Sequence, residues 1–441
     1  MKQIPKSCDV LVIGGGPAGS SAATHLALAG IDVVLFERAN FPRNQVGESL
    51  IPHFWKFTDM TGVSEKIQQE GFIAKAGGVT AWNNNVHQIK FSDFGYTRPG
   101  LHVERDIFDD ILLKHAESTE AVVFNEVAVK NVDFTNTNLP KVFYKDLRDQ
   151  SSIDGSIDCQ YVIDASGHST CLANQFKQRQ TISSKLNFLS MWGYFTHSNF
   201  VGDDRQSHSF ESLANVKPVT FVMSLDGGGW IWHIVLRDKT SVGLVLSTEK
   251  TKGMGRLQRE AFFKQTCKNL PHLNALLAPA QFVEGSLQFR PDYSYYSNNI
   301  CGENYYCIGD AAAFVDPIFS HGVQNAFYNA AVATLAIKES LKNKKHKLRY
   351  SQLCESRMQQ FYGFSRALSL GDFGCNGVDS TLVKNLMRSL PALELELILV
   401  ASEMTNRSDN FRRLAREAGI QGDFDKNFSG ISSEKNEQLL F

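Results

Sequence analysis

A glycine-rich turn near the start of the chain has the residue types and spacing of a dinucleotide-binding loop. Gly14, Gly16 and Gly19 form a G-x-G-x-x-G pattern between a predicted buried strand and a predicted helix. A second predicted strand ends in Glu37, eighteen residues after Gly19, where an acidic side chain can accept a hydrogen bond from a ribose hydroxyl. The helix N-terminus favours a pyrophosphate, and the glycines let the backbone approach it. This complete context predicts a bound dinucleotide.

Two further strand-to-turn segments lie far along the chain. Asp164 to Gly167 follow one predicted buried strand, and Gly309 and Asp310 follow another. An Asp at the second turn can accept from a ribityl hydroxyl, and the helix after it can face a flavin phosphate or the flavin O2 atom. With the segment around Arg105, the three segments resemble the FAD-dependent aromatic hydroxylase superfamily, whose corresponding Arg reaches the cofactor. The resemblance predicts FAD, and no second G-x-G-x-x-G loop follows a strand to bind NAD(P)H permanently.

Two longer motifs resemble flavin-dependent halogenases of the pyrrole and phenol type. They are residues 41–52 (FPRNQVGESLIP) and 309–319 (GDAAAFVDPIF), and the resemblance covers roughly residues 8–340. It implies that reduced FAD and O2 give a C4a-hydroperoxide, that halide attacks it, and that hypohalous acid travels through a tunnel to a lysine. Lys75 stands where that lysine is expected, and its ammonium can donate to hypohalous acid or be chlorinated by it.

Two positions depart from the halogenase pattern. The family's Trp-x-Trp-x-Ile-Pro motif, thought to discourage monooxygenation, runs here from Trp230 through Trp232 to Val235, so its proline is missing. The second departure is His321, directly before Gly322. The family usually has a small hydroxyl residue at this position, and backbone amides there bind halide. A histidine, by contrast, can exchange a proton near neutral pH. We therefore expect an FAD-dependent monooxygenase of halogenase-like fold, which oxidises an electron-rich aromatic ring through the C4a-hydroperoxide without halide.

Several alternatives to this function stay open. Flavoproteins that mature tryptophylquinone cofactors share the fold and hydroxylate a Trp side chain within a partner enzyme, and the chain can belong with them. The others are a halogenase of a carrier-bound pyrrole or phenol, a geranylgeranyl-reductase-like flavin reductase, and a flavoprotein chaperone without turnover. The expected partners are an aromatic substrate (free, in a partner protein or on a carrier protein) and either an external flavin reductase or transient NAD(P)H.

The predicted site residues form three groups. Lys75 and His321 are the candidate catalytic residues, as proton donors or as groups that orient the substrate. The candidate walls of the substrate pocket are Trp192, Trp230, Trp232 and Phe314, and core packing explains each of these equally well. The residues expected to bind FAD are Gly14, Gly16, Ala18, Gly19, Glu37, Arg38, Ser49, Arg105, Val127, Asp164, Gly167, Gly309, Asp310, Pro317, Gly322 and Val323.

The elements that position these residues predict an α/β fold. It comprises a Rossmann-type FAD-binding domain of the GR2 type, an inserted antiparallel β-sheet substrate domain and C-terminal helices. We expect residues 1–184 to form the FAD-binding domain with part of the substrate region (75–105), 185–290 the substrate sheet, 291–345 a return to the FAD-binding domain, and 346–441 a helical region with a polar tail. The predicted strands are 9–13, 31–36, 121–127, 160–165, 190–195, 219–223, 230–236, 241–246 and 305–308, and the predicted helices are 20–29, 107–116, 324–341 and 350–419.

Composition argues against several other classes of protein. The chain has 441 residues with 45 basic and 46 acidic side chains, so its charge indicates no preference for nucleic acid or anionic membranes. No apolar run reaches the length of a membrane span. The first predicted strand begins too early to leave room for a signal peptide. The eight cysteines lack metal-binding spacing, which predicts reduced thiols in a cytoplasmic protein without a metal site.

Overall fold

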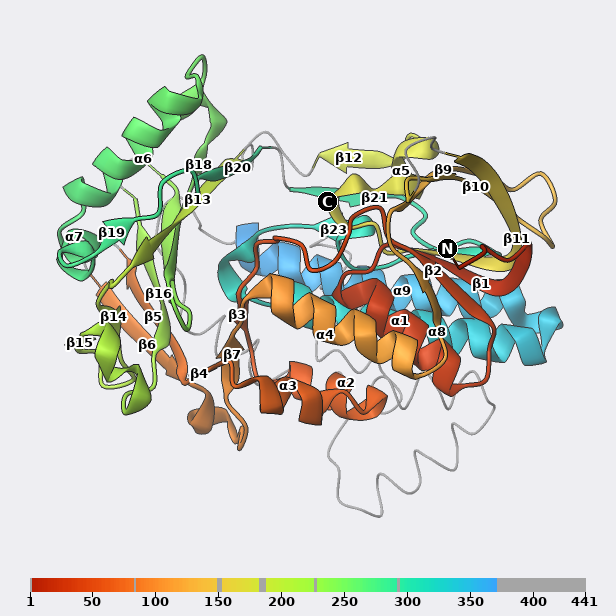
Figure 1. Ribbon diagram of the computed structural model, residues 1–441, viewed down its shortest axis with the longest axis horizontal. Coiled ribbons are helices and arrows are strands. Elements are labelled where there is room, and N and C mark those ends of the chain that lie inside the picture. Colours follow the sequence, from red (N-terminus) through yellow and green to blue (C-terminus); the bar gives the residue numbers. More distant parts are fainter. Residues whose placement is uncertain are drawn as a thin grey trace.

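Two large β-sheets organise the fold, which a computed structural model describes over residues 2–82, 85–148, 153–181, 188–225, 228–291 and 294–370 (Figure 1). The first sheet has the strand order β8-β2-β1-β11-β10-β9, and β22 also pairs with β11. Strands β1 and β2, β1 and β11, β2 and β8, and β11 and β22 are parallel, as in a Rossmann-type sheet. These strands are β1 (Ser7–Ile13), β2 (Val33–Phe36), β8 (Val122–Phe124), β9 (Val127–Asp133), β10 (Lys141–Asp146), β11 (Ile153–Asp164) and β22 (Tyr305–Cys307).

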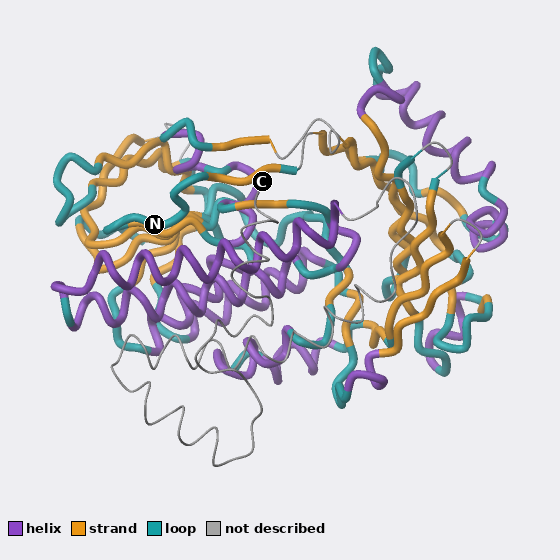
Figure 2. Tube along the Cα trace, turned by 180° about the vertical axis from the view of Figure 1, so that it is seen from behind, coloured by secondary structure: helices purple, strands orange, loops and turns teal. Residues whose placement is uncertain are grey.

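Long helices form a layer against this first sheet (Figure 2). Helix α1 (Pro17–Leu28) packs against α4 (Arg105–Ser118) and α8 (Gly322–Lys342), and α8 packs against α9 (Lys347–Leu370). The small side chains of α1, such as the fully buried Ala22, allow this close packing. Three shorter helices are α2 (Phe54–Thr61), α3 (Ser64–Glu70) and α5 (Cys171–Gln175).

The second sheet has eight strands, in the order β19-β13-β18-β17-β16-β5-β6 with β20 paired to β13. Most pairs are antiparallel as predicted, but β5 and β16 are parallel, because β5 joins the sheet from a segment far earlier in the sequence. One face packs on two helices that the sequence analysis missed, α6 (Arg256–Asn269) and α7 (Pro271–Leu277). The strands are β5 (Gly77–Trp82), β6 (Asn85–Lys90), β13 (Phe188–Thr196), β16 (Val219–Ser224), β17 (Trp230–Val235), β18 (Thr240–Ser247), β19 (Gln281–Phe282) and β20 (Gln288–Pro291).

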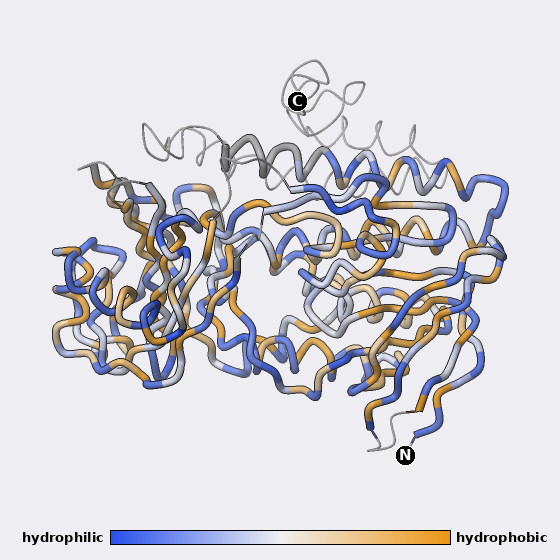
Figure 3. Tube along the Cα trace, turned by 90° about the horizontal axis from the view of Figure 1, so that it is seen from above, coloured by the Kyte–Doolittle hydropathy of each residue, from blue (hydrophilic) through white to orange (hydrophobic). Residues whose placement is uncertain are grey.

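Side chains alternate between the two faces of this second sheet. Ile231 packs toward α6 and α7, whereas its neighbours Trp230 and Trp232 belong to a separate aromatic cluster on the opposite face. The period of two along a strand explains this division, because successive side chains point to opposite faces. Figure 3 shows hydrophobic and hydrophilic residues interspersed along the chain.

A small three-stranded sheet connects segments that are distant in the sequence. It consists of β3 (Ser49–Leu50), β7 (Gly100–His102) and β4 (Ile73–Lys75), in the order β3-β7-β4. Ser49 pairs with His102, and Lys75 pairs with Gly100. The remaining short strands are β12 (Arg179–Thr181), β14 (Phe200–Val201), β15 (Ser207–His208), β21 (Tyr295–Ser297) and β23 (Ala313–Phe314).

Some predicted boundaries need correction. The predicted strand 121–127 is two strands, β8 and β9, because the chain turns at Glu126, whose φ is 59°. The predicted helix 350–419 is α9 as far as Leu370, and its remainder lies outside the described residues. The proposed domain boundaries stay predictions.

Within the described residues, no helix has both the length and the apolar character to cross a bilayer, and no group of His, Cys, Asp and Glu side chains is arranged to hold a metal ion.

Candidate active site

A cavity of about 680 Å³ extends from the glycine-rich turn to strands β16 and β17. Its volume is within the range of small-molecule and cofactor sites. Thirteen of the sixteen residues predicted to bind FAD line it, together with His321, Trp230, Trp232 and Phe314. The predicted residues outside the lining are Gly19, Asp164, Gly309, Trp192 and Lys75.

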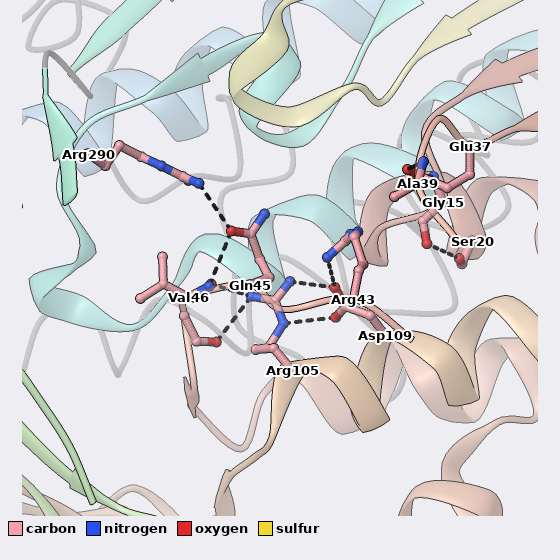
Figure 4. A network of polar contacts seen from close by, with 11 residues as sticks. Gly15, Ser20, Glu37, Ala39, Arg43, Gln45, Val46, Arg105, Asp109 and Arg290 are labelled. Carbon is pink, nitrogen blue, oxygen red and sulfur yellow. Dashed lines mark hydrogen bonds and ion pairs between the residues drawn. The ribbon is translucent and has the colours of Figure 1, made fainter. Parts of the chain in front are cut away.

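The glycines of the glycine-rich turn let the protein pack closely around it. Gly14 has a φ of +105°, and a Cβ there would lie 2.5 Å from the Ala165 carbonyl oxygen. A Cβ at Gly19 would collide with the Gly14 carbonyl oxygen, so Gly19 provides close packing behind the cavity wall. The Glu37 carboxylate accepts from the Gly15 amide at 2.7 Å and from the Ala39 amide at 2.8 Å (Figure 4). Because a carboxylate has about four acceptor positions, Glu37 can brace this turn and still accept from a ribose hydroxyl.

Two helices begin at this cavity without a side-chain cap. Helix α1 starts after Gly16, and α8 starts after His321, and neither residue caps the first turn through its side chain. Uncapped amides at a helix N-terminus bind anions and polar oxygens. Two such helix ends, a glycine cradle and the Glu37 carboxylate fit the diphosphate, ribose and polar ring edge of FAD.

Asp164 and Gly309 act behind the cavity lining. The Asp164 carboxylate is fully buried and accepts from the amides of Ser166 at 3.0 Å and Leu172 at 2.7 Å. Gly309 has a φ of +57° and donates its amide to Asn329 Oδ1 at 3.0 Å. Both residues therefore shape the turns that line the cavity.

Arg105 lines the cavity, but its guanidinium is engaged mainly with the protein (Figure 4). It donates to both oxygens of Asp109, at 2.8 and 2.9 Å, and to the carbonyl oxygens of Val46 at 2.8 Å and Gly47 at 3.2 Å. Arg43 donates to the same carboxylate at 3.1 Å. This network holds the 43–47 loop against the cavity, a role that the sequence resemblance did not predict.

Asp310 lies in the cavity wall among cationic side chains. Burial raises the pKa of its carboxyl to about 6, despite the opposing charges of Arg105 and Arg290. One carboxylate oxygen lies 3.4 Å from His168 Nε2, and 32% of the side chain remains accessible from the cavity. Burial also lowers the pKa of His168 to about 3, so its ring is neutral near pH 7. The Asp310 carboxylate is thus available to a hydroxyl donor in the cavity.

Asp310→Asn should weaken FAD binding by about 10-fold, because it replaces a charged acceptor with a neutral amide oxygen, which forms a weaker hydrogen bond. In the unchanged protein, FAD affinity should fall as the pH drops through about 6, where the free carboxylate takes up a proton. Fluorescence titration of the apoprotein with FAD measures both effects. Asp238→Asn, at a side chain that is 73% exposed, is the matched control. Unaltered affinity in Asp310→Asn would remove Asp310 from the FAD site.

Lys75 is buried next to the cavity, behind Ser49. Its side chain is 3% exposed, and Nζ donates to Ser49 Oγ at 2.7 Å. The ammonium also lies 5.3 Å from the centre of the Phe91 ring. Burial lowers the pKa of Lys75 to about 7, so the ammonium and amine forms are both accessible at neutral pH. The lysine expected from the resemblance is therefore adjacent to the cavity and separated from it by a single hydroxyl group.

The hydroxyl group expected at position 321 occurs one residue earlier. Ser320 adopts a left-handed conformation with a φ of 55°, and its hydroxyl donates to Ser49 Oγ at 3.0 Å. His321 is 7% exposed, and burial lowers its pKa to about 4. A histidine that is neutral near pH 7 is a poor proton donor, which disfavours that role for His321, whereas its role in orienting the substrate stays a prediction. A search for serine next to the expected position would have found Ser320.

The aromatic residues form one wall of the cavity. Trp230 and Trp232 lie on β17 with their rings 5.7 Å apart, and Trp232 Nε1 donates to Ser241 Oγ at 3.1 Å. Gly243 leaves room for the Trp232 ring, because a Cβ there would collide with it. Trp192 belongs to the same cluster without lining the cavity, so it supports this wall from behind. This arrangement can hold a flat aromatic ring.

Comparisons with known proteins identify relatives along most of the chain. The FAD binding domain family model matches residues 7–365. A tryptophan 2-halogenase from Chondromyces crocatus is 32% identical over 340 residues, which are 76% of this chain and 62% of that protein, so the chain spans less than two thirds of its length. The flavin-dependent halogenase armH2 from Armillaria mellea is 31% identical over 359 residues, covering 77% of this chain and 67% of that protein.

Solved structures that are similar to this chain also include halogenases. The myxobacterial chondrochloren halogenase CndH has a TM-score of 0.76 and 27% identity, covering 99% of this chain and 96% of that chain. The flavin-dependent brominase Bmp2 has a TM-score of 0.71 at 22% identity, covering 94% of this chain and 99% of that chain, which is a likeness of fold.

Proposed function

The chain belongs to the flavin-dependent halogenase superfamily of FAD-binding proteins, and from that premise we propose that it halogenates an electron-rich aromatic ring. This proposal takes up the halogenase alternative in place of the expected monooxygenase. The halogenase relatives support it better, and hydroxylation of a Trp during tryptophylquinone maturation is not confirmed. The identity of the ring, as a free indole, phenol or pyrrole or one held by a carrier protein, belongs to the proposal.

The contact of Lys75, Ser49 and Ser320 is the observation that carries the proposal. Ser49 lines the cavity, and its Oγ accepts from both Lys75 Nζ at 2.7 Å and Ser320 Oγ at 3.0 Å. The resemblance implies a lysine at the end of the path of hypohalous acid, and it placed halide binding in the loop that contains Ser320. The Ser49 hydroxyl group contacts both Lys75 and this loop.

Each part of the site has a task in this reaction. Reduced FAD, when bound, supplies the chemistry that turns O2 and halide into hypohalous acid. Hypohalous acid has to pass Ser49 to reach Lys75, because Ser49 separates the lysine from the cavity. The Lys75 ammonium then donates to the oxygen of hypohalous acid while the oxygen–halogen bond breaks and the carbon–halogen bond forms. The ring then loses its proton to the Lys75 amine, which restores the ammonium, and the released oxygen leaves as water. The buried surroundings of Lys75 exclude water from this transfer.

We expect product formation to require chloride or bromide. The assay supplies reduced FAD and O2 to the purified protein with indoles, phenols and carrier-bound pyrroles, with and without halide, and mass spectrometry identifies the product. A halogen isotope pattern that appears only with halide would support the proposal. Incorporation of oxygen from O2 without halide would instead establish the monooxygenase that the Val235 and His321 departures predicted.

A further inference from the structure

A continuous chain of buried polar groups extends from Lys75 to a histidine outside the proposed machinery. Beyond the contact of Lys75 with Ser49, Ser49 Oγ lies 2.8 Å from Thr220 Oγ1. Thr220 Oγ1 lies 2.9 Å from His102 Nε2, and His102 Nδ1 lies 3.0 Å from the Val235 carbonyl oxygen. The side chains of Lys75, Ser49, Thr220 and His102 are between 0 and 7% exposed. These four side chains lie on four strands of two sheets, β3, β4 and β7 of the small sheet and β16 of the eight-stranded sheet, and the fold holds them in line.

One carbonyl group fixes the direction of every hydrogen bond in this chain. The Val235 oxygen can only accept, so His102 Nδ1 must carry the proton. In a neutral imidazole the other nitrogen is then an acceptor, so Thr220 donates its hydroxyl proton to His102 Nε2. Having used that proton, Thr220 must accept from Ser49.

The Ser49 oxygen can therefore accept a hydrogen bond from Lys75 but cannot donate one to it. Its single proton goes to Thr220, and its oxygen accepts from Lys75 and from Ser320. An oxygen that only accepts stabilises an ammonium and offers no hydrogen bond to the lone pair of a neutral amine. The network thus opposes the loss of the lysine proton that burial favours.

We propose that His102 is a positioning residue that acts through Thr220 and Ser49 to hold Lys75 in its protonated, hydrogen-bonded form. The inference rests on the proposed function, in which the Lys75 ammonium donates to hypohalous acid. His102 itself stays neutral, because burial first, and then the charges of Lys75 and His233, lower its pKa well below the usual value. The Val235 hydrogen bond acts in the opposite direction without changing this outcome.

The protonation of Lys75 can be measured directly in the FAD-loaded protein. Lysine labelled with ¹³C at Cε reports its own titration by NMR, and Lys75→Met identifies the signal. Thr220→Val removes both hydrogen bonds of Thr220 and frees the Ser49 hydroxyl to donate to the amine. The pKa of Lys75 should then fall by on the order of one pH unit. Thr220→Ser keeps the hydroxyl and should restore the original titration.

A second pair of variants tests the histidine. His102→Gln can donate to Val235 O and accept from Thr220, so it should preserve the Lys75 titration, whereas His102→Leu should lower it as Thr220→Val does. In the unchanged protein, ¹⁵N-histidine spectra should show His102 protonated at Nδ1. An unchanged Lys75 titration in folded Thr220→Val, or a His102 proton at Nε2, would overturn the inference. Neither measurement requires halogenation, so a wild-type protein that forms no halogenated product would refute the proposed function separately.

Discussion

Lys75→Met is expected to lower the formation of halogenated product by roughly 10²- to 10⁴-fold, the usual contribution of a positioned proton donor. Methionine approximates the length and volume of the lysine stem but has no donor for the oxygen of hypohalous acid. FAD should remain bound, because Lys75 lies behind Ser49 and does not line the cavity. The measurement compares halogenated product per reduced FAD consumed in the variant and in the unchanged protein.

The same variant should be at least as stable as the unchanged protein near pH 7. The pKa of Lys75 is lowered from 10.5 to about 7 by burial, so the unfolded chain binds more protons between these values. The stability of the unchanged protein should therefore rise, relative to Lys75→Met, as the pH increases from about 7 toward 10.5. Urea unfolding at several pH values measures this difference.

Lys66→Met is the matched control, because Lys66 reaches the exposed hydroxyl of Ser118 rather than the cavity. It should leave product formation unchanged. If Lys75→Met retained full halogenation while folded and loaded with FAD, Lys75 would have no part in the reaction.

Much of the cavity lining was predictable, because the residues that suggest FAD binding lie in short, continuous segments. The glycine turn, the strand before it and the helix after it lie together in sequence, and Glu37 closes the same unit. Such local patterns determine both the fold of the unit and the ligand that its helix N-terminus accepts. Thirteen of the sixteen predicted FAD residues accordingly line one cavity, and the other three lie outside its lining.

The connections between distant segments were not predictable in this way. Ser49, Thr220 and Ser320 meet only because the small β3-β7-β4 sheet packs against β16 and the start of α8. A serine, a threonine or a lone histidine carries no signal in a single sequence, since each is common in cores and caps. The same holds for Asp109, whose role depends on the side chains that meet it in space.

Asp109→Ala is expected to destabilise the protein by about 3–5 kcal/mol, the usual result of removing one partner of a buried ion pair. The Asp109 carboxylate is fully buried and neutralises Arg105, which is itself only 7% exposed. Without it, the Arg105 guanidinium stays buried without its carboxylate, and Arg43 also loses its partner. Because Arg105 holds the carbonyl groups of Val46 and Gly47, the loop at the cavity should loosen and FAD should dissociate more readily. Urea unfolding and FAD release on dilution measure the two effects.

Asp110, the residue after Asp109, provides the control for Asp109→Ala. Asp110 pairs with Lys114 one turn along the same helix, and the lysine side chain is 70% exposed. A pair of this kind contributes only about 0.3–0.5 kcal/mol, so Asp110→Ala should change stability little. The double variant Asp109→Leu with Arg105→Met removes both charges and should recover much of the lost stability. It should still release FAD, because the guanidinium that donates to the 46–47 carbonyl groups is then absent. Equal unfolding free energies for Asp109→Ala and Asp110→Ala would show that the buried pair does not stabilise this part of the fold.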